Sequence, residues 1–320
     1  MIYAVWIPLL VPLLAVPAAR RGAEHLPHRT AVWMLTALAL TLAVSSTAAL
    51  GLLALSGALH LPFVAALGHL SPPLLGGDWP VTAPAAILAA LALGALGALV
   101  LRRTSRHVRE LRAAHRQFTS PATAGDLSVR HDDQPDAYAL PGRPGRIVVT
   151  TGMLRALSAR EREVLFAHER AHLTGRHHLF LAATEFALAL HPVLRGLRAP
   201  LSYALERWAD ESAAAVTGDR ALTARAIGRA ALAAHTAGPA PRPRMSLTAT
   251  AGPVPRRVTA LLNAAPPSTR AGRLLTRALA CLLMLCVALS AAAAIDAATD
   301  LHTGIEIAQG EALPHSGDAD

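Results

Sequence analysis

Long apolar runs are the main pattern along this chain. A helix that crosses a membrane needs about 20 predominantly apolar residues. Four stretches meet this requirement, at residues 2–19, 32–58, 83–101 and 274–297. The sequence therefore predicts a mainly α, polytopic membrane protein that crosses a lipid bilayer with about four transmembrane helices.

Charged residues divide the loops between these runs into two kinds. Residues 20–29 and 102–116 are rich in arginine, residues 59–82 contain none, and residues 298–320 are acidic. Cytoplasmic loops collect positive charge, so this alternation predicts that both termini lie outside and that residues 102–273 lie in the cytoplasm. We expect four regions: an N-terminal membrane region (1–101) with three transmembrane helices, a cytoplasmic domain (102–273), a C-terminal transmembrane helix (274–297) and a short extracytoplasmic tail (298–320).

The composition supports a membrane protein and argues against a nucleic-acid binder. Hydrophobic residues make up 53% of the chain and charged residues 16%, against about 25% charged in a typical soluble domain. The formal net charge is +9, and all 30 basic residues are arginines. Since the arginines lie mainly beside apolar runs, where topology explains them, we expect no direct binding of nucleic acid. Heavy use of Ala and Arg indicates a GC-rich bacterial genome, and hence a bacterial plasma membrane.

The cytoplasmic segment has the pattern of one α+β domain. Residues 146–152, RIVVTTG, alternate and are β-branched, which predicts a strand that could take a peptide substrate along its edge. Residues 157–175 predict a helix, with a capping box at its start and a glycine at its end. Residues 200–217 predict another helix, and residues 235–272, rich in Pro, Gly, Ser and Thr, predict a mobile connector. The apolar residues 179–190 are too few to span a membrane, so we expect a helix on the cytoplasmic leaflet or inside the domain.

The helix at 157–175 contains the sequence HERAH, an H-E-x-x-H pattern. His168 and His172 are four residues apart and share one helix face, so both imidazoles can bind one Zn²⁺ ion. Glu169 then lies beside the metal, where it can act as the general base that takes a proton from water. A solvated surface helix is the alternative interpretation. The apolar flanks in EVLFAHERAHL argue against it, because unpaired polar groups are costly in such surroundings.

A zinc hydrolase needs a third protein ligand and one open position. His178 would complete the metzincin pattern H-E-x-x-H-x-x-G-x-x-H. Glu206 is the other candidate, and Asp210, one helical turn later, suits an acid that orients a ligand histidine. His177 either shields or orients substrate or has no role. The residues alone leave the third ligand open.

Several segments between about residues 130 and 260 resemble one group of enzymes. They are PDAYALPGRPGRIVVTTGML, LSAREREVLFAHERAHLTGRHH, HPVLR, ERWADESA and RRVTALL. The chain resembles the integral-membrane zinc metallopeptidases (gluzincins) of the BlaR/MecR antirepressor type, which are related to the heat-shock and prenyl-protein (CAAX) membrane peptidases. The resemblance implies a zincin-like domain in which His168, His172 and Glu206 bind Zn²⁺, Glu169 is the catalytic base and Asp210 supports a ligand. A metzincin would also need a methionine turn, for which Met245 is a poor candidate, so we favour Glu206 over His178.

The resemblance implies a membrane zinc endopeptidase that hydrolyses a protein or peptide substrate at the cytoplasmic face. A cytoplasmic transcription repressor is a candidate substrate by analogy. Direct antibiotic sensing is not expected, since no penicillin-binding domain follows residue 297 in the sequence. Two alternatives remain: a membrane quality-control peptidase with the same site, and a catalytically silent signalling or scaffold protein.

Overall fold

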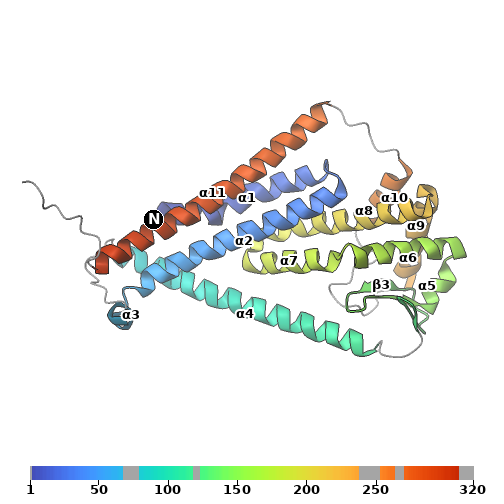
Figure 1. The fold of residues 1–320 in the computed structure, drawn as a ribbon, viewed down its shortest axis with the longest axis horizontal. Coiled ribbons are helices and arrows are strands. Elements are labelled where there is room, and N and C mark those ends of the chain that lie inside the picture. The colour runs from blue at the N-terminus through green and yellow to red at the C-terminus, as the bar shows by residue number, and fades with distance from the viewer. Residues whose placement is uncertain (1, 68–78, 118–122, 238–252, 264–269, 310–320) are drawn as a thin grey trace, which may run out of the picture.

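A computed structural model describes residues 2–67, 79–117, 123–237, 253–263 and 270–309. Long helices run along the long axis of the molecule, and shorter helices and a small sheet gather at one end (Figure 1). The long helices, with the short α3 that follows the second of them, are α1 (Ile2–Ala23), α2 (His28–Ala58), α3 (Pro62–Leu67), α4 (Trp79–Gln117) and α11 (Arg270–Gln309).

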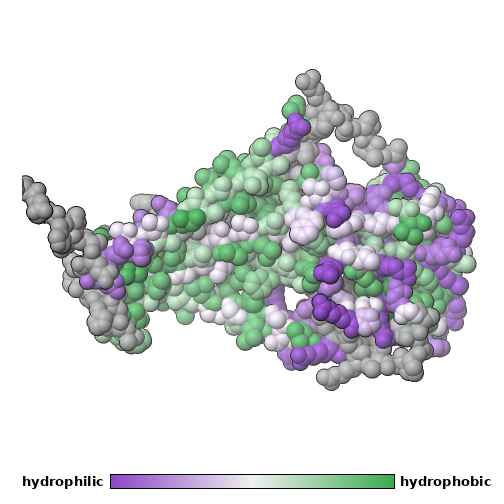
Figure 2. All heavy atoms as spheres, viewed as in Figure 1, coloured by the Kyte–Doolittle hydropathy of each residue, from purple (hydrophilic) through white to green (hydrophobic). Residues whose placement is uncertain are grey.

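Three described helices are long and apolar enough to cross a membrane: His28–Ala58, Ala83–Glu110 and Ala280–Ile307. They coincide with three of the four predicted spans, and Figure 2 shows the hydrophobic surface they form. The fourth, at residues 2–19, is helical as α1 but contains three prolines and is not among these three helices. A span by α1 therefore stays a prediction.

The long helices continue across the expected domain boundaries. Helix α4 runs without a break through residue 101 to Gln117, and α11 begins at Arg270 and ends at Gln309. The boundaries expected at 101, 273 and 297 thus fall inside helices. Residues 298–309, expected in the tail, are helical too.

A four-stranded sheet lies at the end of the molecule opposite the apolar helix ends. It contains β1 (Thr123–Ala124), β2 (Leu127–Arg130), β3 (Ala137–Leu140) and β4 (Arg146–Thr150), in the order β1-β2-β4-β3. Strand β4 pairs in parallel with β2 and antiparallel with β3. The expected strand therefore exists, but the idea that substrate adds to its edge is wrong, because β4 has a neighbouring strand on each side.

Helices of the domain follow the sheet. They are α5 (Thr151–Ala156), α6 (Ala159–Thr174), α7 (His177–Leu190), the 3₁₀ helix η2 (Pro192–Leu197), α8 (Arg198–Thr217), α9 (Arg220–Ala237) and α10 (Val254–Leu262). The expected helices at 157–175 and 200–217 are confirmed as α6 and α8. With 14 residues, α7 is too short to cross a membrane, as expected. The mobile connector expected at 235–272 is wrong in part, since α10 lies inside it and packs on α9 and α8.

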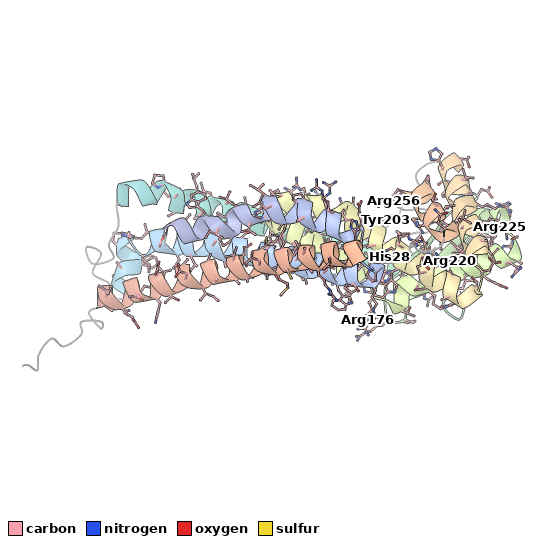
Figure 3. The ribbon with its side chains drawn as sticks, turned by 90° about the horizontal axis from the view of Figure 1, so that it is seen from above. His28, Arg176, Tyr203, Arg220, Arg225 and Arg256 are labelled. Carbon is pink, nitrogen blue, oxygen red and sulfur yellow. The ribbon has the colours of Figure 1, made fainter. Side chains whose placement is uncertain are left out.

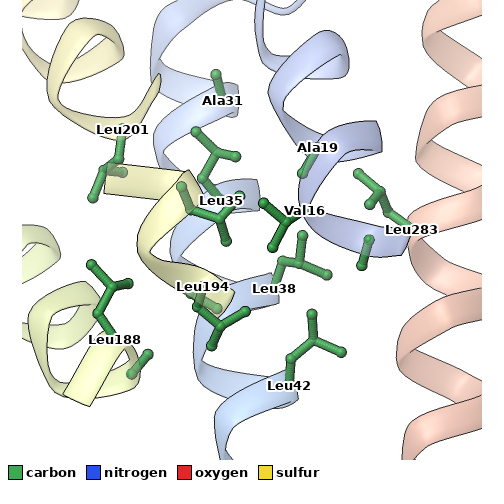
Figure 4. Close-up of a cluster of buried hydrophobic side chains, with 14 of the residues drawn as sticks. Val16, Ala19, Ala31, Leu35, Leu38, Leu42, Leu188, Leu194, Leu201 and Leu283 are labelled. Carbon is green, nitrogen blue, oxygen red and sulfur yellow. The ribbon is translucent and has the colours of Figure 1, made fainter. Parts of the chain in front are cut away.

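The domain is fixed to the membrane helices by a shared apolar cluster (Figure 4). Leu35 and Leu42 of α2 lie in this cluster with Leu188 of α7, Leu201 of α8 and Leu283 of α11, all almost fully buried. Because α6 and α8 pack against each other and α8 packs on α2, the position of the domain helices depends on the membrane helices.

The loop between α1 and α2 lies on the same side as the domain. Arg256 of α10 forms an ion pair with Glu24 at 3.2 Å, and the Arg29 guanidinium lies over the Trp208 ring of α8. Figure 3 shows His28 close to the domain end, where Arg220 and Arg225 also lie. The structure thus places the basic residues 20–29 beside the domain, which agrees with the one-sided distribution of arginine.

Candidate metal centre

Helix α6 presents its two histidines on one buried face. The helix begins at a capping box, in which Ser158 N donates to Glu161 Oε2 at 2.9 Å, and Gly175 forms its C-cap. His168 is completely buried, His172 is 3% exposed, and their Nε2 atoms lie 3.1 Å apart. The four-residue spacing therefore brings two ring nitrogens to one point, as the sequence predicts.

Helix α8 adds the carboxylate of Glu206 to the two imidazoles. Glu206 Oε2 lies 3.5 Å from His168 Nε2, and Oε1 lies 3.7 Å from His172 Nε2. Zn²⁺ ligands at 2.0–2.2 Å in a tetrahedron lie roughly 3.3–3.5 Å from one another, close to these separations. One buried carboxylate with two imidazoles is also a donor set that zinc uses, so these residues fit the metal.

His178 stands apart from this cluster. Among the residues that the structure describes, the group that could hold a metal consists of His168, His172 and Glu206. His178 is half-buried at the start of α7 and does not belong to it. Met245, considered for a methionine turn, lies outside the described residues.

Asp210 and an arginine complete one side of the cluster. Asp210 Oδ1 lies 3.1 Å from His168 Nδ1. Arg257 of α10 donates to both Asp210 oxygens, from Nε at 2.9 Å and from Nη2 at 2.6 Å, and its Nη1 lies 2.9 Å from Glu206 Oε2. Arg257 is completely buried, so one guanidinium joins two buried carboxylates in a charge-assisted network.

Sequence reasoning missed Arg257. Arg257 lies in the segment RRVTALL, inside the stretch 235–272 whose composition predicted a mobile connector. The adjacent Arg256 is exposed, as expected for a connector. The amphipathic run VPRRVTALL was the available signal, because Leu261, four residues after Arg257, lies on the same helix face and is buried. Arg257 is engaged with Asp210 and Glu206.

His177 contacts His172, the second histidine of the cluster. Its Nδ1 lies 2.7 Å from His172 Nδ1, and its ring lies 4.6 Å from the Trp208 ring, centre to centre. Gly175 makes this position possible, since a Cβ there would approach His177 Nε2 to 2.5 Å. His177 therefore contacts a candidate ligand rather than lying idle at the helix start.

The electrostatics of the cluster follow from burial and these contacts. Burial would lower the pKa of His168, but Asp210 and Glu206 outweigh it and raise the pKa to about 9. Burial would raise the pKa of Asp210, but Arg257 and His168 hold it at about 2. Burial lowers the pKa of His177 to about 3 and that of His172 well below its usual value. His172 and His177 are therefore neutral at pH 7, so one Nδ1 can donate to the other.

Glu169 occupies the position between the two histidines in the sequence of α6, and its side chain is completely buried. Because it is adjacent to His168 and three residues before His172, it belongs to the helix turn that carries both. His168, Glu169, His172, Glu206 and Asp210 are all buried on α6 and α8. Arg257 contacts Asp210 and Glu206, and His177 contacts His172.

Comparison with protein-family models matches residues 101–265 to peptidase family M48. The match spans 165 of the 320 residues (265 − 101 + 1), which is just over half of the chain. The chain belongs to peptidase family M48. This membership makes it a zinc metallopeptidase by family, and all residues of the cluster, Arg257 included, lie within the matched M48 region. Searches of curated proteins and of solved structures gave no match.

Family M48 confirms the coarse part of the resemblance drawn from the sequence, namely a zinc metallopeptidase. Relationship to the BlaR/MecR type in particular stays a prediction. The M48 match begins at residue 101 and therefore includes the basic end of α4, which belongs to one helix with the third apolar run.

Proposed function

We propose that this M48 protein is a membrane-embedded zinc endopeptidase that hydrolyses peptide bonds at the cytoplasmic face of a bacterial plasma membrane. One observation carries the proposal: two imidazoles and one carboxylate converge in a buried cluster, and Glu169 belongs to the same helix turn. A cytoplasmic repressor is the substrate suggested by analogy with the antirepressor peptidases.

In this proposal His168, His172 and Glu206 are the zinc ligands. Zinc held by them would polarise the scissile carbonyl and lower the pKa of water at the fourth position to about 7. The Glu169 carboxylate accepts a proton from the attacking water and delivers it to the leaving amine.

The surrounding residues hold the ligands in the correct form. Asp210 Oδ1 lies 3.1 Å from His168 Nδ1 and favours a proton on that nitrogen, so Nε2 is the atom that would lose its proton and bind the metal. His177 does the same for His172 through the 2.7 Å contact between the Nδ1 atoms. Arg257 neutralises one of the two negative charges of Glu206 and Asp210, so this group keeps a net charge of −1 toward a divalent cation.

The full chain, purified in detergent, tests these roles by its zinc content and by cleavage of an unfolded protein such as casein. We expect Glu169→Gln to keep zinc while cleavage falls by about 10²–10⁴-fold. Glu206→Gln loses both zinc and cleavage. His178→Ala, the matched control, keeps both.

Two results would contradict the proposal. A wild-type protein that binds no zinc excludes the enzyme and favours a scaffold. If Glu206→Gln keeps zinc and His178→Ala loses it, the metzincin-like ligand set is correct instead.

A further inference from the structure

A cavity of about 590 Å³ lies between α4 and α7, at the basic end of α4. Leu99 and Val100 of α4 and Phe186 of α7 form apolar walls, and Arg102, Arg103 and Arg106 line the same cavity. Figure 2 shows an opening between these two helices. No residue of the metal cluster lines this cavity, so it is a separate site.

Positive charge predominates in the cavity. Four arginines and two glutamates line it. Glu185 forms an ion pair with Arg198, in which Arg198 Nε lies 2.7 Å from Glu185 Oε1. The other three arginines that line the cavity, Arg102, Arg103 and Arg106, all come from α4. Anionic groups with several oxygens, phosphate above all, are what such guanidinium groups bind.

The cavity lies where a membrane helix leaves the bilayer. Residues 83–101 of α4 contain no charged side chain, and Arg102 is the first charged residue after them. Figure 2 shows the hydrophobic surface change to a hydrophilic one near this level. The apolar walls therefore lie at the depth of acyl chains, and the guanidinium groups lie at the depth of headgroups.

We propose that this cavity binds an anionic phospholipid. Its phosphate contacts Arg103 and Arg106, and its acyl chain lies along Leu99 and Phe186, which is 44% exposed. A basic pocket between helices at the membrane surface has the chemistry of an anionic headgroup site. A zwitterionic lipid fits less well, because its own cation would face the arginines.

Native mass spectrometry of the full chain in detergent tests whether the cavity binds an anionic lipid. The probe is a short-chain phosphatidylglycerol, and the phosphatidylcholine with the same acyl chains is the comparison. The pocket variant is Arg103→Gln with Arg106→Gln. The matched control is Arg109→Gln with Arg112→Gln, which removes the same charge from the same helix outside the cavity. Ala182→Trp fills the cavity from α7 and keeps every charge.

We expect wild type to bind phosphatidylglycerol more tightly than phosphatidylcholine. The pocket variant should bind it about 25-fold more weakly, since each arginine near a membrane surface contributes roughly fivefold. The control should bind as wild type, Ala182→Trp should bind weakly, and inorganic phosphate should not displace the lipid.

Three results would overturn the proposal. Equal losses in the pocket and control variants would mean diffuse attraction to the basic helix. Unchanged binding in Ala182→Trp would place the lipid elsewhere. Full displacement by inorganic phosphate, or by an acidic peptide at lower concentration, would assign the cavity to a small anion or to a peptide.

Discussion

His177 and His178 are neighbours at the start of α7 with different surroundings. His177 is completely buried against His172 and Trp208, whereas His178 is half-buried and outside the metal cluster. We predict that His177→Phe weakens zinc binding by about 10–100-fold, because His172 loses the acceptor that orients it. His177→Gln, which keeps an acceptor, should recover part of the affinity.

Competition with a zinc chelator of known affinity measures these differences, with His178→Ala as the control at the adjacent position. Equal affinities for His177→Phe and wild type would show that His172 needs no such support.

Arg256 and Arg257 form a second pair of adjacent residues with opposite environments. Arg257 is buried and compensates one of the two negative charges of Asp210 and Glu206, so its removal leaves an excess of buried negative charge beside His168 and Arg207. We expect Arg257→Met to destabilise the metal-free protein by about 3–5 kcal/mol. The Arg256 side chain is 54% exposed and pairs with an exposed glutamate, so Arg256→Met should cost no more than about 1 kcal/mol.

Thermal unfolding in detergent, with zinc removed, compares the two variants. Adding Asp210→Asn to Arg257→Met should restore part of the lost stability, because it removes one of the two buried carboxylate charges. If the two arginine variants unfold at the same temperature, the buried network is not what holds α10 to α8.

At the scale of elements, the turn between β4 and α5 depends on one glycine. Thr150 caps α5 by accepting from Met153 N, and a Cβ at Gly152 would lie 2.2 Å from the Asp133 carbonyl oxygen. We predict that Gly152→Ala destabilises the protein by about 1–3 kcal/mol, because the clash is with backbone that cannot move alone.

Gly228→Ala is the control for this substitution. Gly228 lies inside α9, where the nearest atom to a Cβ is 3.9 Å away, so alanine fits and should stabilise the helix by up to about 1 kcal/mol. Unfolding temperatures of the two variants should move in opposite directions. A Gly152→Ala protein as stable as wild type would show that the loop at Asp133 adapts.

The sequence predicts some elements well because their ends carry local signals. Ser158, Glu161 and Gly175 locate both ends of α6, and Gly218 marks the end of α8. Helix α10 has Pro255 in its first turn, but it has no capping side chain at its start and no glycine at its end. With nine residues it is too short to be stable alone and depends on packing against α9 and α8. Arg257 was missed for this reason, since its role arises only when α10 docks.

The candidate site likewise contains some residues that the sequence predicts and others that only the fold brings together. The spacing of His168 and His172 lies within one helix, so the sequence predicts their common face directly. The third member is distant in the chain, and only the packing of α8 on α6 brings in Glu206 rather than His178. The contact of His177 with His172 also needs the turn at Arg176, whose φ of 50° is left-handed, and no residue pattern in the sequence indicates it.

At the scale of the whole molecule, the basic loop and the domain lie on one side, and the turn after α2 lies at the other end of that helix. We predict that the domain side is cytoplasmic, because arginine collects there. In a background of Cys281→Ala and Cys286→Ala, three exposed positions test this: His25→Cys, Leu61→Cys and Arg225→Cys.

A membrane-impermeant thiol reagent applied to intact spheroplasts should label Leu61→Cys alone. His25→Cys and Arg225→Cys should react only after the membrane is opened, and they should do so together, because α1, α2 and the domain share one packed cluster. Labelling of Arg225→Cys in intact spheroplasts would reverse the orientation and place the metal cluster outside the cytoplasm. Labelling of His25→Cys without Arg225→Cys would contradict the contact between Glu24 and Arg256, and with it the packing of the domain on the membrane helices.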